Sequence, residues 1–192
     1  FNCFDYACAA LMGYNNHMIR NGYLQVTPAK RGEIDTETAL EGYRRGLFPM
    51  GSSRSEDFYA WFTHVPRGIL PLDALHVSKS LKKVLKKDLF DITSDRAFEN
   101  VISACAVGRD GDPENATWIS KPVKKLFMDL HHAGHAHSIE CWQNGELVGG
   151  LYGLHIGGAF VGESMFSIEP NASKVALVHL VDHLNKQGFL LL

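Results

Sequence analysis

Alternating apolar and polar positions predict an antiparallel meander in the last third of the chain. Three runs carry this pattern, AHSIECWQ, ELVGGLYGLHI and AFVGESMFS, and each is expected to bury one face. They are joined by Asn144-Gly145 and Gly157-Gly158, dipeptides that favour tight hairpin turns. A helix with a wide apolar face is predicted at 173–186, and GFLLL begins a further strand. A meander followed by a helix and a strand indicates an α+β fold.

Helical periodicity and capping residues predict four more helices earlier in the chain. They span about 36–45, 79–87, 95–106 and 120–132, with a strand at 90–94. Asp35 or Thr36 is suited to cap the first helix, Gly46 to end it, and Ser78 to cap the second. Between the first two helices, GLFPMGSSRSEDFYAWF is expected to form a loop with exposed aromatic side chains.

Two proline residues in VPRGILPLD predict a connection between subdomains. We therefore expect a small N-terminal domain at 18–70 and a larger domain at 71–192. The chain begins with Phe1, and Met18 opens a stretch that is typical of a protein start. Residues 1–17 are therefore expected to be a non-native or disordered leader, and the final GFLLL strand is expected to be cut short.

The composition is that of an ordinary globular protein. The chain has 192 residues, of which 45% are hydrophobic and 21% charged, with a net charge of −2. The overall charge therefore gives no indication of nucleic-acid binding, and no apolar run reaches the roughly 18 residues that a membrane span needs. The four cysteines have no C-x-x-C spacing, which favours free thiols in a reducing compartment. We expect a cytoplasmic monomer.

One carboxylate, Glu163, lies in the third strand of the meander among Phe160, Val161, Met165 and Phe166. A glutamate in such surroundings is rarely buried without a partner. Either it faces water on the wet side of a half-buried strand, or it lines a pocket and holds a cationic or hydrogen-donating group. The strand alone leaves both interpretations open.

A lysine-rich surface is predicted on the second helix. Four of its lysines recur at helical spacing and so share one face. The five lysines of this stretch are Lys79, Lys82, Lys83, Lys86 and Lys87. They form either an ordinary solvated face or a local positive surface that binds phosphates. Trp61 and Trp118 are expected in the core by default, although a tryptophan beside a basic surface can stack on a base.

The histidines of HHAGHAHS do not predict a metal site. Gly134 breaks the helix between His131 and His135, so the two rings lose their helical register, and no cysteine or acidic residue lies at ligand spacing. Hydrogen-bonded histidines at a polar helix end are favoured instead. No G-x-S-x-G motif occurs, and Cys141 has no evident base beside it. A pocket built on Glu163 without a nucleophile suits a substrate that is already activated.

Eight segments then occur in one order, namely YRRGLFPM, PRGILPLD, HVSKSLKK, DRAFENVISACA, TWIS, LHHAGHAHSIECWQNGELVGGLYG, GESMFS and NASKVALVHLV. Over about 18–192 this pattern resembles the leucyl/phenylalanyl-tRNA–protein transferase family. The resemblance implies a small N-terminal domain and a larger domain of acetyltransferase-like (GNAT-like) fold. It also implies transfer of Leu or Phe from aminoacyl-tRNA to the N-terminal Arg or Lys of bacterial proteins, which marks them for degradation. No cofactor is implied, because the aminoacyl ester is already activated.

The resemblance also assigns residues to roles. Glu163 is the polar group of the aminoacyl pocket, Leu151, Ser164 and Met165 bind the aminoacyl substrate, and Trp118 lies near the terminal adenosine. The tRNA phosphates would meet Lys79, Lys82, Lys83, Lys86 and Lys87. Such a pocket suits Leu and Phe and would disfavour Val and Ile by about 1–3 kcal/mol per misplaced methyl.

Some positions depart from the family pattern. Met50 stands where the family commonly has Trp, so this substrate-binding position offers a thioether contact instead of a stacking platform. Val65 replaces an Asp, and the sequence stops at Leu192, where the family continues into an Asp-X-Gln that acts on the attacking amine. A truncated, non-catalytic tRNA-binding remnant therefore stays open as an alternative. An acyl-CoA-dependent N-acetyltransferase is the other, although SIEPNASKVAL lacks the glycines of a pyrophosphate loop.

Overall fold

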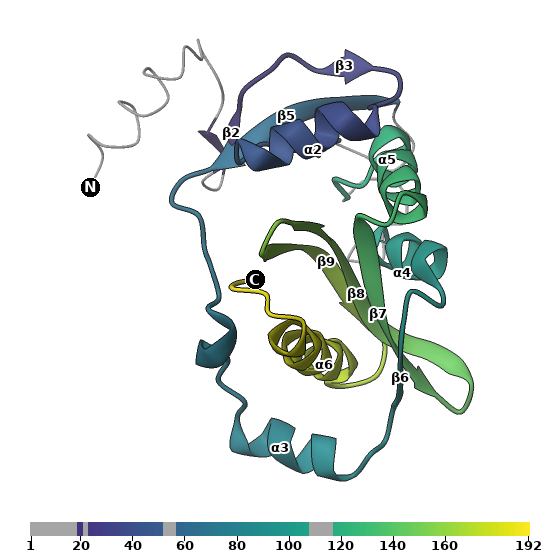
Figure 1. Ribbon diagram of the computed structural model, residues 1–192. Helices are drawn as coiled ribbons and strands as arrows, with labels where there is room; N and C mark the ends of the chain where they lie inside the picture. The colour runs from purple at the N-terminus through teal and green to yellow at the C-terminus, as the bar shows by residue number, and fades with distance from the viewer. Residues whose placement is uncertain (1–18, 21–22, 52–56, 108–116) are drawn as a thin grey trace. The chain divides into compact units, whose positions relative to one another are not determined.

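A computed structural model of the protein describes residues 19–20, 23–51, 57–107 and 117–192, which form two compact units (Figure 1). The first unit holds the described residues up to Gly68 and the segment that ends at Leu126. The second holds the described residues of Ile69–Pro113, together with Phe127–Leu192. The domain division predicted from the sequence stays a prediction, and the leader expected at 1–17 lies outside the described residues.

The first unit is built around one central strand, β5. Its helix and strands are β1 (Ile19–Arg20), β2 (Tyr23–Gln25), β3 (Lys30–Arg31), α2 (Thr36–Arg44), β4 (Phe48–Met50) and β5 (Phe58–His64). Strand β5 pairs antiparallel with β2, β3 and β4. Helix α2 begins where the sequence predicts, because the Asp35 carboxylate accepts hydrogen bonds from the N–H groups of Glu37 and Thr38, at 3.0 and 3.3 Å.

The loop predicted for GLFPMGSSRSEDFYAWF is wrong at both of its ends, which form β4 and β5. Phe48, Tyr59 and Trp61 are buried rather than exposed. The ring of Trp61 lies so close to α2 that a methyl group at Gly42 would come within 2.5 Å of it. Pairing with strands distant in sequence gives these aromatic residues their core positions, and local turn residues carry no signal of that pairing.

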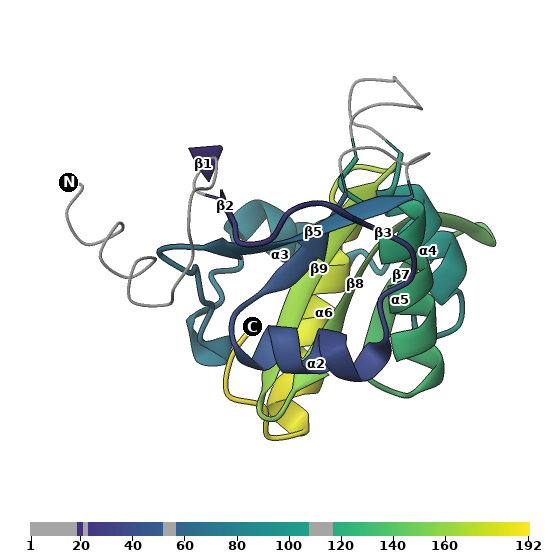
Figure 2. The ribbon, with the colours of Figure 1, turned by 90° about the horizontal axis from the view of Figure 1, so that it is seen from above.

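The second unit contains the predicted meander. Its elements are η1 (Leu72–Ala74), α3 (Lys79–Lys86), β6 (Asp91–Ser94), α4 (Phe98–Cys105), the end of α5 (Lys121–His132), β7 (Ala136–Gln143), β8 (Glu146–Ile156), β9 (Ala159–Ser167) and α6 (Ala172–Lys186). The antiparallel sheet has the order β6-β7-β8-β9, and its last three strands lie side by side in both views (Figures 1 and 2). Asn144 and Gly145 make the first turn with φ angles of 53° and 81°.

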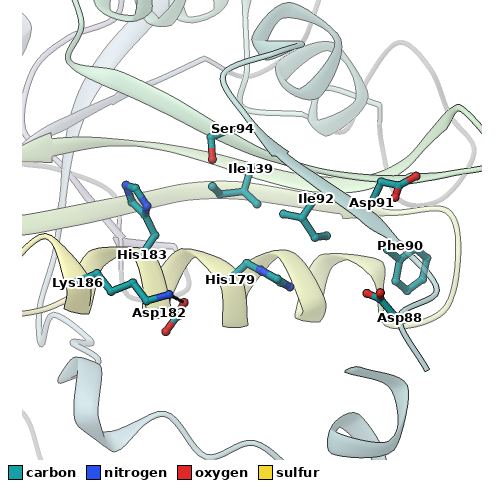
Figure 3. Close-up of a pocket in the computed structure, with 10 residues that line it drawn as sticks. All are labelled: Asp88, Phe90, Asp91, Ile92, Ser94, Ile139, His179, Asp182, His183 and Lys186. Carbon is teal, nitrogen blue, oxygen red and sulfur yellow. Dashed lines mark hydrogen bonds and ion pairs between the residues drawn. The ribbon is translucent and has the colours of Figure 1, made fainter. Parts of the chain in front are cut away.

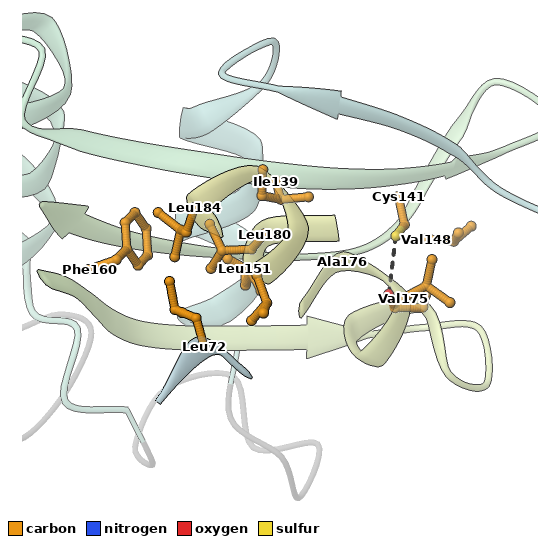
Figure 4. Close-up of a cluster of buried hydrophobic side chains, with 12 residues drawn as sticks. Leu72, Ile139, Cys141, Val148, Leu151, Phe160, Val175, Ala176, Leu180 and Leu184 are labelled. Carbon is orange, nitrogen blue, oxygen red and sulfur yellow. Dashed lines mark hydrogen bonds between the residues drawn. The ribbon is translucent and has the colours of Figure 1, made fainter. Parts of the chain in front are cut away.

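Helices cover both faces of this sheet. Helix α6 packs on one face, where residues from β7, β8, β9, α6 and η1 form a buried hydrophobic cluster that includes Leu151, Phe160 and Leu180 (Figure 4). Helix α4 packs on the other, where Val101 lies against Gly150. Gly149 brings α6 close to β8, because a methyl group there would lie 3.1 Å from the Ala172 carbonyl carbon and nearer still to the Ala172 methyl.

The last described residues lie along the open edge of β9, where the strand expected from GFLLL is present only as isolated bridges at Leu191. Phe160 donates its N–H to the carbonyl of Leu191 at 3.0 Å, and Leu190 donates to Gly158 at 2.8 Å. On the other side, Leu70 and Leu192 exchange two backbone hydrogen bonds of 2.6 and 2.9 Å. Residues 190–192 therefore lie between β9 and the start of the second unit.

Two sheets and five α-helices within the described residues make this a mixed α/β protein. The acetyltransferase-like assignment stays a proposal. Of the helices in the described ranges, none is both long and apolar enough to cross a membrane.

We predict that Gly149→Ala lowers the free energy of unfolding by about 1–3 kcal/mol, because the added methyl forces α6 away from β8. Urea denaturation followed by circular dichroism measures the change. Gly162→Ala is the matched control, since its added methyl meets only Leu192 at an ordinary 3.7 Å. Equal stability of the two variants would show that the contact between Gly149 and α6 is not tight in solution.

Candidate active site

The candidate site is centred on a bulge between β8 and β9. Tyr152 pairs with Ser164 and Gly153 with Gly162, so Glu163 is the extra residue on β9. A bulge interrupts the alternation of a strand and often redirects a side chain next to a functional site. Glu163 is half-buried, and its charge acts on the phenol of Tyr152. Glu163 is therefore not simply an exposed residue on the solvent face of a regular strand.

The bulge divides the predicted pocket residues between the two faces of the sheet. Leu151 and Met165 are direct cross-strand partners and so share a face. Leu151 belongs to the buried cluster under α6, whereas Met165 keeps 42% of its surface exposed. Ser164 pairs with Tyr152 and contacts Cys105 of α4, on the opposite face. The structure therefore groups Leu151 with Met165, and Ser164 with α4.

Tyr152 is the buried polar residue that the sequence analysis missed. Its ring makes edge contacts with Phe98 and Phe127, with centroids 5.8 and 5.1 Å apart. Within the described part of the chain its hydroxyl is fully buried and has no hydrogen-bond partner. Burial, then the charges of Glu163 and Cys105, raise the pKa of Tyr152 well above that of a free phenol. The phenol therefore stays protonated next to the Glu163 carboxylate.

The two cysteines within the described residues are poor nucleophiles. Burial raises the pKa of Cys105 to about 12, although the hydrogen bond with Ser164 acts in the other direction. Burial likewise raises the pKa of Cys141 to about 12, and its thiol donates to the Ala172 carbonyl at 3.1 Å. Both side chains stay as thiols at neutral pH. The site therefore favours chemistry that needs no thiolate.

A second carboxylate, Glu140 on β7, is completely buried. Its oxygens accept hydrogen bonds from the hydroxyls of Ser138 and Thr93, the latter at 2.5 Å, and from the Arg96 N–H at 3.4 Å. Trp142 donates its indole N–H to Thr93 at 2.8 Å. These bonds occupy the carboxylate inside the unit, so Glu140 holds β6 and β7 together.

The lysine-rich surface lies on α3. Ser78 caps this helix by accepting a 3.2 Å hydrogen bond from Leu81 N–H, and the apolar side of the helix packs on the buried cluster. The five lysines of this surface are Lys79, Lys82, Lys83, Lys86 and Lys87, and all are exposed. Within the described residues none of them forms an ion pair. Their positive charge is therefore available to an external anion.

Met50 and Trp118 both belong to the first unit. Met50 pairs with Ala60 in the sheet, and the neighbouring Gly51 donates its N–H to the Trp118 carbonyl at 2.8 Å. This bond fixes the backbones of the Met50 and Trp118 segments side by side, and both side chains are half-buried. The two residues expected to contact the substrate from this unit thus lie together.

Two of the histidines, His131 and His137, are hydrogen-bonded, as the sequence favours. The Nδ1 atom of His131 lies 2.9 Å from the Ala136 carbonyl, and its ring stacks on Phe98 with centroids 4.2 Å apart. The Nδ1 atom of His137 lies 2.8 Å from the Asp95 carboxylate, and its Nε2 lies 3.3 Å from Nδ1 of His155. Among the described residues, no group of three or more histidine, cysteine or acidic side chains is arranged to hold a metal ion.

Comparison with known proteins decides the family. The family model for leucyl/phenylalanyl-tRNA protein transferase matches residues 69–192. Proteins named leucyl/phenylalanyl-tRNA–protein transferase from Rhizorhabdus wittichii, Paramagnetospirillum magneticum and Chlorobaculum parvum are 52%, 51% and 50% identical over 159 residues. This chain belongs to the leucyl/phenylalanyl-tRNA–protein transferase family.

The relatives differ in how much of their length is matched. The aligned residues make up 83% of this chain in all three cases, and 63%, 75% and 80% of the respective relatives. A further relative, from Novosphingobium aromaticivorans, is matched over 58% of its length. The chain thus spans less than two thirds of some members of its family.

A solved structure is also similar at the level of the chain trace. It is described as L-PGS from Bacillus licheniformis and aligns with a TM-score of 0.42 at 14% sequence identity, covering 85% of this chain and 50% of that one. This likeness is too low to carry an argument about fold or function. The family assignment depends on the sequence relatives, and it agrees with the resemblance found from the ordered motifs.

Proposed function

We propose that this protein transfers Leu or Phe from aminoacyl-tRNA to the N-terminal Arg or Lys of acceptor proteins, which marks those proteins for degradation. The observation that carries the proposal is the family match over residues 69–192, which includes the bulge at Glu163 and the lysines of α3. Aminoacyl-tRNA and the acceptor proteins meet in the bacterial cytoplasm, where we place the reaction. The larger unit takes the acetyltransferase-like fold in this proposal.

The reaction needs positioning more than activation. The acceptor amine attacks the ester carbonyl carbon, the new C–N bond forms, and the C–O bond to the tRNA ribose breaks. The proton released by the amine passes to the ribose oxygen or to solvent. Because the ester is already activated, a site that brings amine and carbonyl together supplies most of the acceleration. Neither a thiolate nor ATP has a place in this scheme.

Residues of the second unit hold the aminoacyl group in this scheme. The Glu163 carboxylate orients its α-ammonium group through a charge-assisted hydrogen bond. Met165, with 42% of its surface exposed, offers the apolar contact for a Leu or Phe side chain. Leu151 lies behind Met165 in the core and fixes the wall of the pocket, while Ser164 anchors the strand to α4.

The tRNA itself meets two further surfaces. The exposed lysines of α3 bind backbone phosphates, which matches their lack of ion pairs within the described residues. Trp118 supplies an aromatic surface on which the terminal adenosine stacks, and Met50 is a further substrate-binding position. The acceptor protein needs only its N-terminal residue at the site.

We predict that the protein transfers label from Leu-tRNA to a peptide beginning with Arg and leaves a peptide beginning with Ala unlabelled, without ATP or acetyl-CoA. Acid-precipitable label and mass spectrometry of the peptide measure the product. Added acetyl-CoA should leave the product unchanged. Acetylation of the peptide, or an absence of transfer to the Arg peptide, would contradict the proposed function.

Glu163→Gln is expected to lower this transfer about 10–100-fold, because the charge that orients the α-ammonium group is lost. Glu146→Gln, a change at an exposed strand position, is the matched control and should leave the rate unchanged. Steady-state rates at several Leu-tRNA concentrations separate binding from turnover. A normal rate in Glu163→Gln would remove Glu163 from the site while leaving the activity itself in place.

We predict that Lys82→Ala combined with Lys83→Ala weakens tRNA binding and lowers the salt dependence of log Kd by roughly 1–2. Each lysine that meets a phosphate contributes about one released counterion. Filter binding across a range of salt concentrations measures the slope. Lys174→Ala, an exposed lysine on α6, is the control. A slope equal to that of the unchanged protein would make the α3 lysines an ordinary solvated face.

A further inference from the structure

The phenol of Tyr152 on β8 is buried in the second unit without a hydrogen-bond partner among the described residues. Its ring lies between Phe98 of α4 and Phe127 of α5, which meet it edge-on at interplanar angles of 74° and 76°. No part of the side chain reaches the surface. The hydroxyl is therefore held in one place and kept away from water.

The burial of this hydroxyl carries a free-energy penalty. A hydroxyl removed from water loses its hydrogen bonds, and a phenylalanine ring would fill the same space without that loss. Protein interiors seldom keep such a group, and one that is kept calls for a reason, such as a role at a functional site. The packing of the core alone thus gives no use for the O–H of Tyr152.

Two side chains act electrostatically on this phenol, those of Glu163 and Cys105. Cys105 stays a thiol and already has a hydrogen bond with Ser164. The Glu163 carboxylate is thus the charged acceptor next to the phenol. Because burial raises the pKa of Tyr152 well above that of a free phenol, the hydroxyl keeps its proton and can donate a hydrogen bond.

The bulge places Glu163 across from this tyrosine. The register between β8 and β9 shifts between Tyr152 and Gly153, and Glu163 is the extra residue opposite that step. Gly153 keeps the two strands close there, because a methyl group at its position would collide with the Val161 carbonyl oxygen. An extra residue does not follow the alternation of the strand, so rotation about the side-chain bonds of Glu163 can bring its carboxylate to the phenol.

Carboxylates at the other edge of the sheet have different surroundings. A cavity of about 460 Å³ lies between β6 and α6, and its wall includes the exposed side chains of Asp88 and Asp182 (Figure 3). Asp182 is paired with Lys186 at 2.5 Å. Within the described residues, no buried hydroxyl that lacks a partner lines this cavity. In the second unit, the carboxylate next to an unused buried donor is therefore that of Glu163.

We propose that Tyr152 is a positioning residue for Glu163. Its phenol O–H donates to one carboxylate oxygen, and the other oxygen then faces the α-ammonium group of the aminoacyl-tRNA. This role rests on the proposed function, in which Glu163 orients that group. The bond forms when the substrate draws the carboxylate into place, which accounts for the unused hydroxyl in the free protein.

A tyrosine is well suited to this role. Its hydroxyl supplies a hydrogen bond without a positive charge, so the Glu163 carboxylate keeps its full attraction for the ammonium group. The aromatic contacts of Phe98 and Phe127 fix the donor in advance, so little freedom is lost when the bond forms. The preference of the site for a free α-ammonium group should therefore depend on Tyr152.

The test compares the affinities of Leu-tRNA and N-acetyl-Leu-tRNA, because the acetylated form lacks the α-ammonium group. In filter binding the unchanged protein should prefer Leu-tRNA. Tyr152→Phe should lower this preference about tenfold, the size of a lost hydrogen bond to a charged group. Its stability in urea should equal or exceed that of the unchanged protein, because the hydroxyl that is removed has no partner within the described residues.

Two further variants separate positioning from packing. Tyr59→Phe makes the same change at a buried tyrosine of the first unit and should leave the preference unchanged. In Glu163→Ala the carboxylate is absent, so adding Tyr152→Phe should lower the preference no further. A tyrosine that serves only packing would weaken the binding of both tRNAs alike and would leave their ratio unchanged.

An unchanged preference in Tyr152→Phe would overturn the proposal, and so would a further fall when this change is added to Glu163→Ala. Binding is measured without turnover, so the result is independent of the assay with the Arg peptide. Transfer to the Arg peptide together with an unchanged preference in Tyr152→Phe would overturn the role of Tyr152 alone. A preference that falls as expected, without transfer by the unchanged protein, would support that role and contradict the proposed function alone.

Discussion

The close approach of α6 to the sheet is the constraint on which the second unit depends. Gly149 on β8 and Ala172 at the start of α6 have just enough room for each other, so the helix lies flat on β7, β8 and β9. That contact encloses the hydrophobic cluster around Leu151 and Leu180, and it leaves a cavity where the helix and strands diverge. A larger side chain at either position would change all of these together, because interiors are close-packed and transmit strain.

The bulge in β9 has a second, more local effect. A regular strand would continue the alternation through Glu163 and place every later side chain on the other face of the sheet. With one extra residue, Leu151 and Met165 stay together on the α6 side while Ser164 and Tyr152 stay with α4. Because Glu163 is the extra residue, its side chain does not have to point either into the core or into solvent, as it would on a regular strand. This is the structural reason why a single strand serves both the packing of the unit and the proposed pocket.

Much of this architecture follows from local sequence. The hairpins at Asn144-Gly145 and Gly157-Gly158, the cap at Asp35, the cap at Ser78 and the apolar stripe of α6 are each encoded within a few residues, and the structure confirms them. What the sequence did not reveal depends on contacts between distant segments. The start of β5 has the local sequence of a loop, because two of the strands that it pairs with, β2 and β3, lie far from it in the chain. The burial of Tyr152 and Glu140, and the alignment of Asp95, His137 and His155, likewise exist only once β6 to β9 are paired.

The pairing of residues 190–192 has a consequence for synthesis on the ribosome. These residues cover part of the outer edge of β9 and are hydrogen-bonded to Leu70, which is made long before them. During translation, the outer edge of β9 and the backbone at Leu70 and Pro71 keep unpaired N–H and C=O groups until residues 190–192 have been made. Such an uncovered edge is a template for pairing with another chain. The growing polypeptide therefore keeps this edge uncovered until its last described residues leave the exit tunnel.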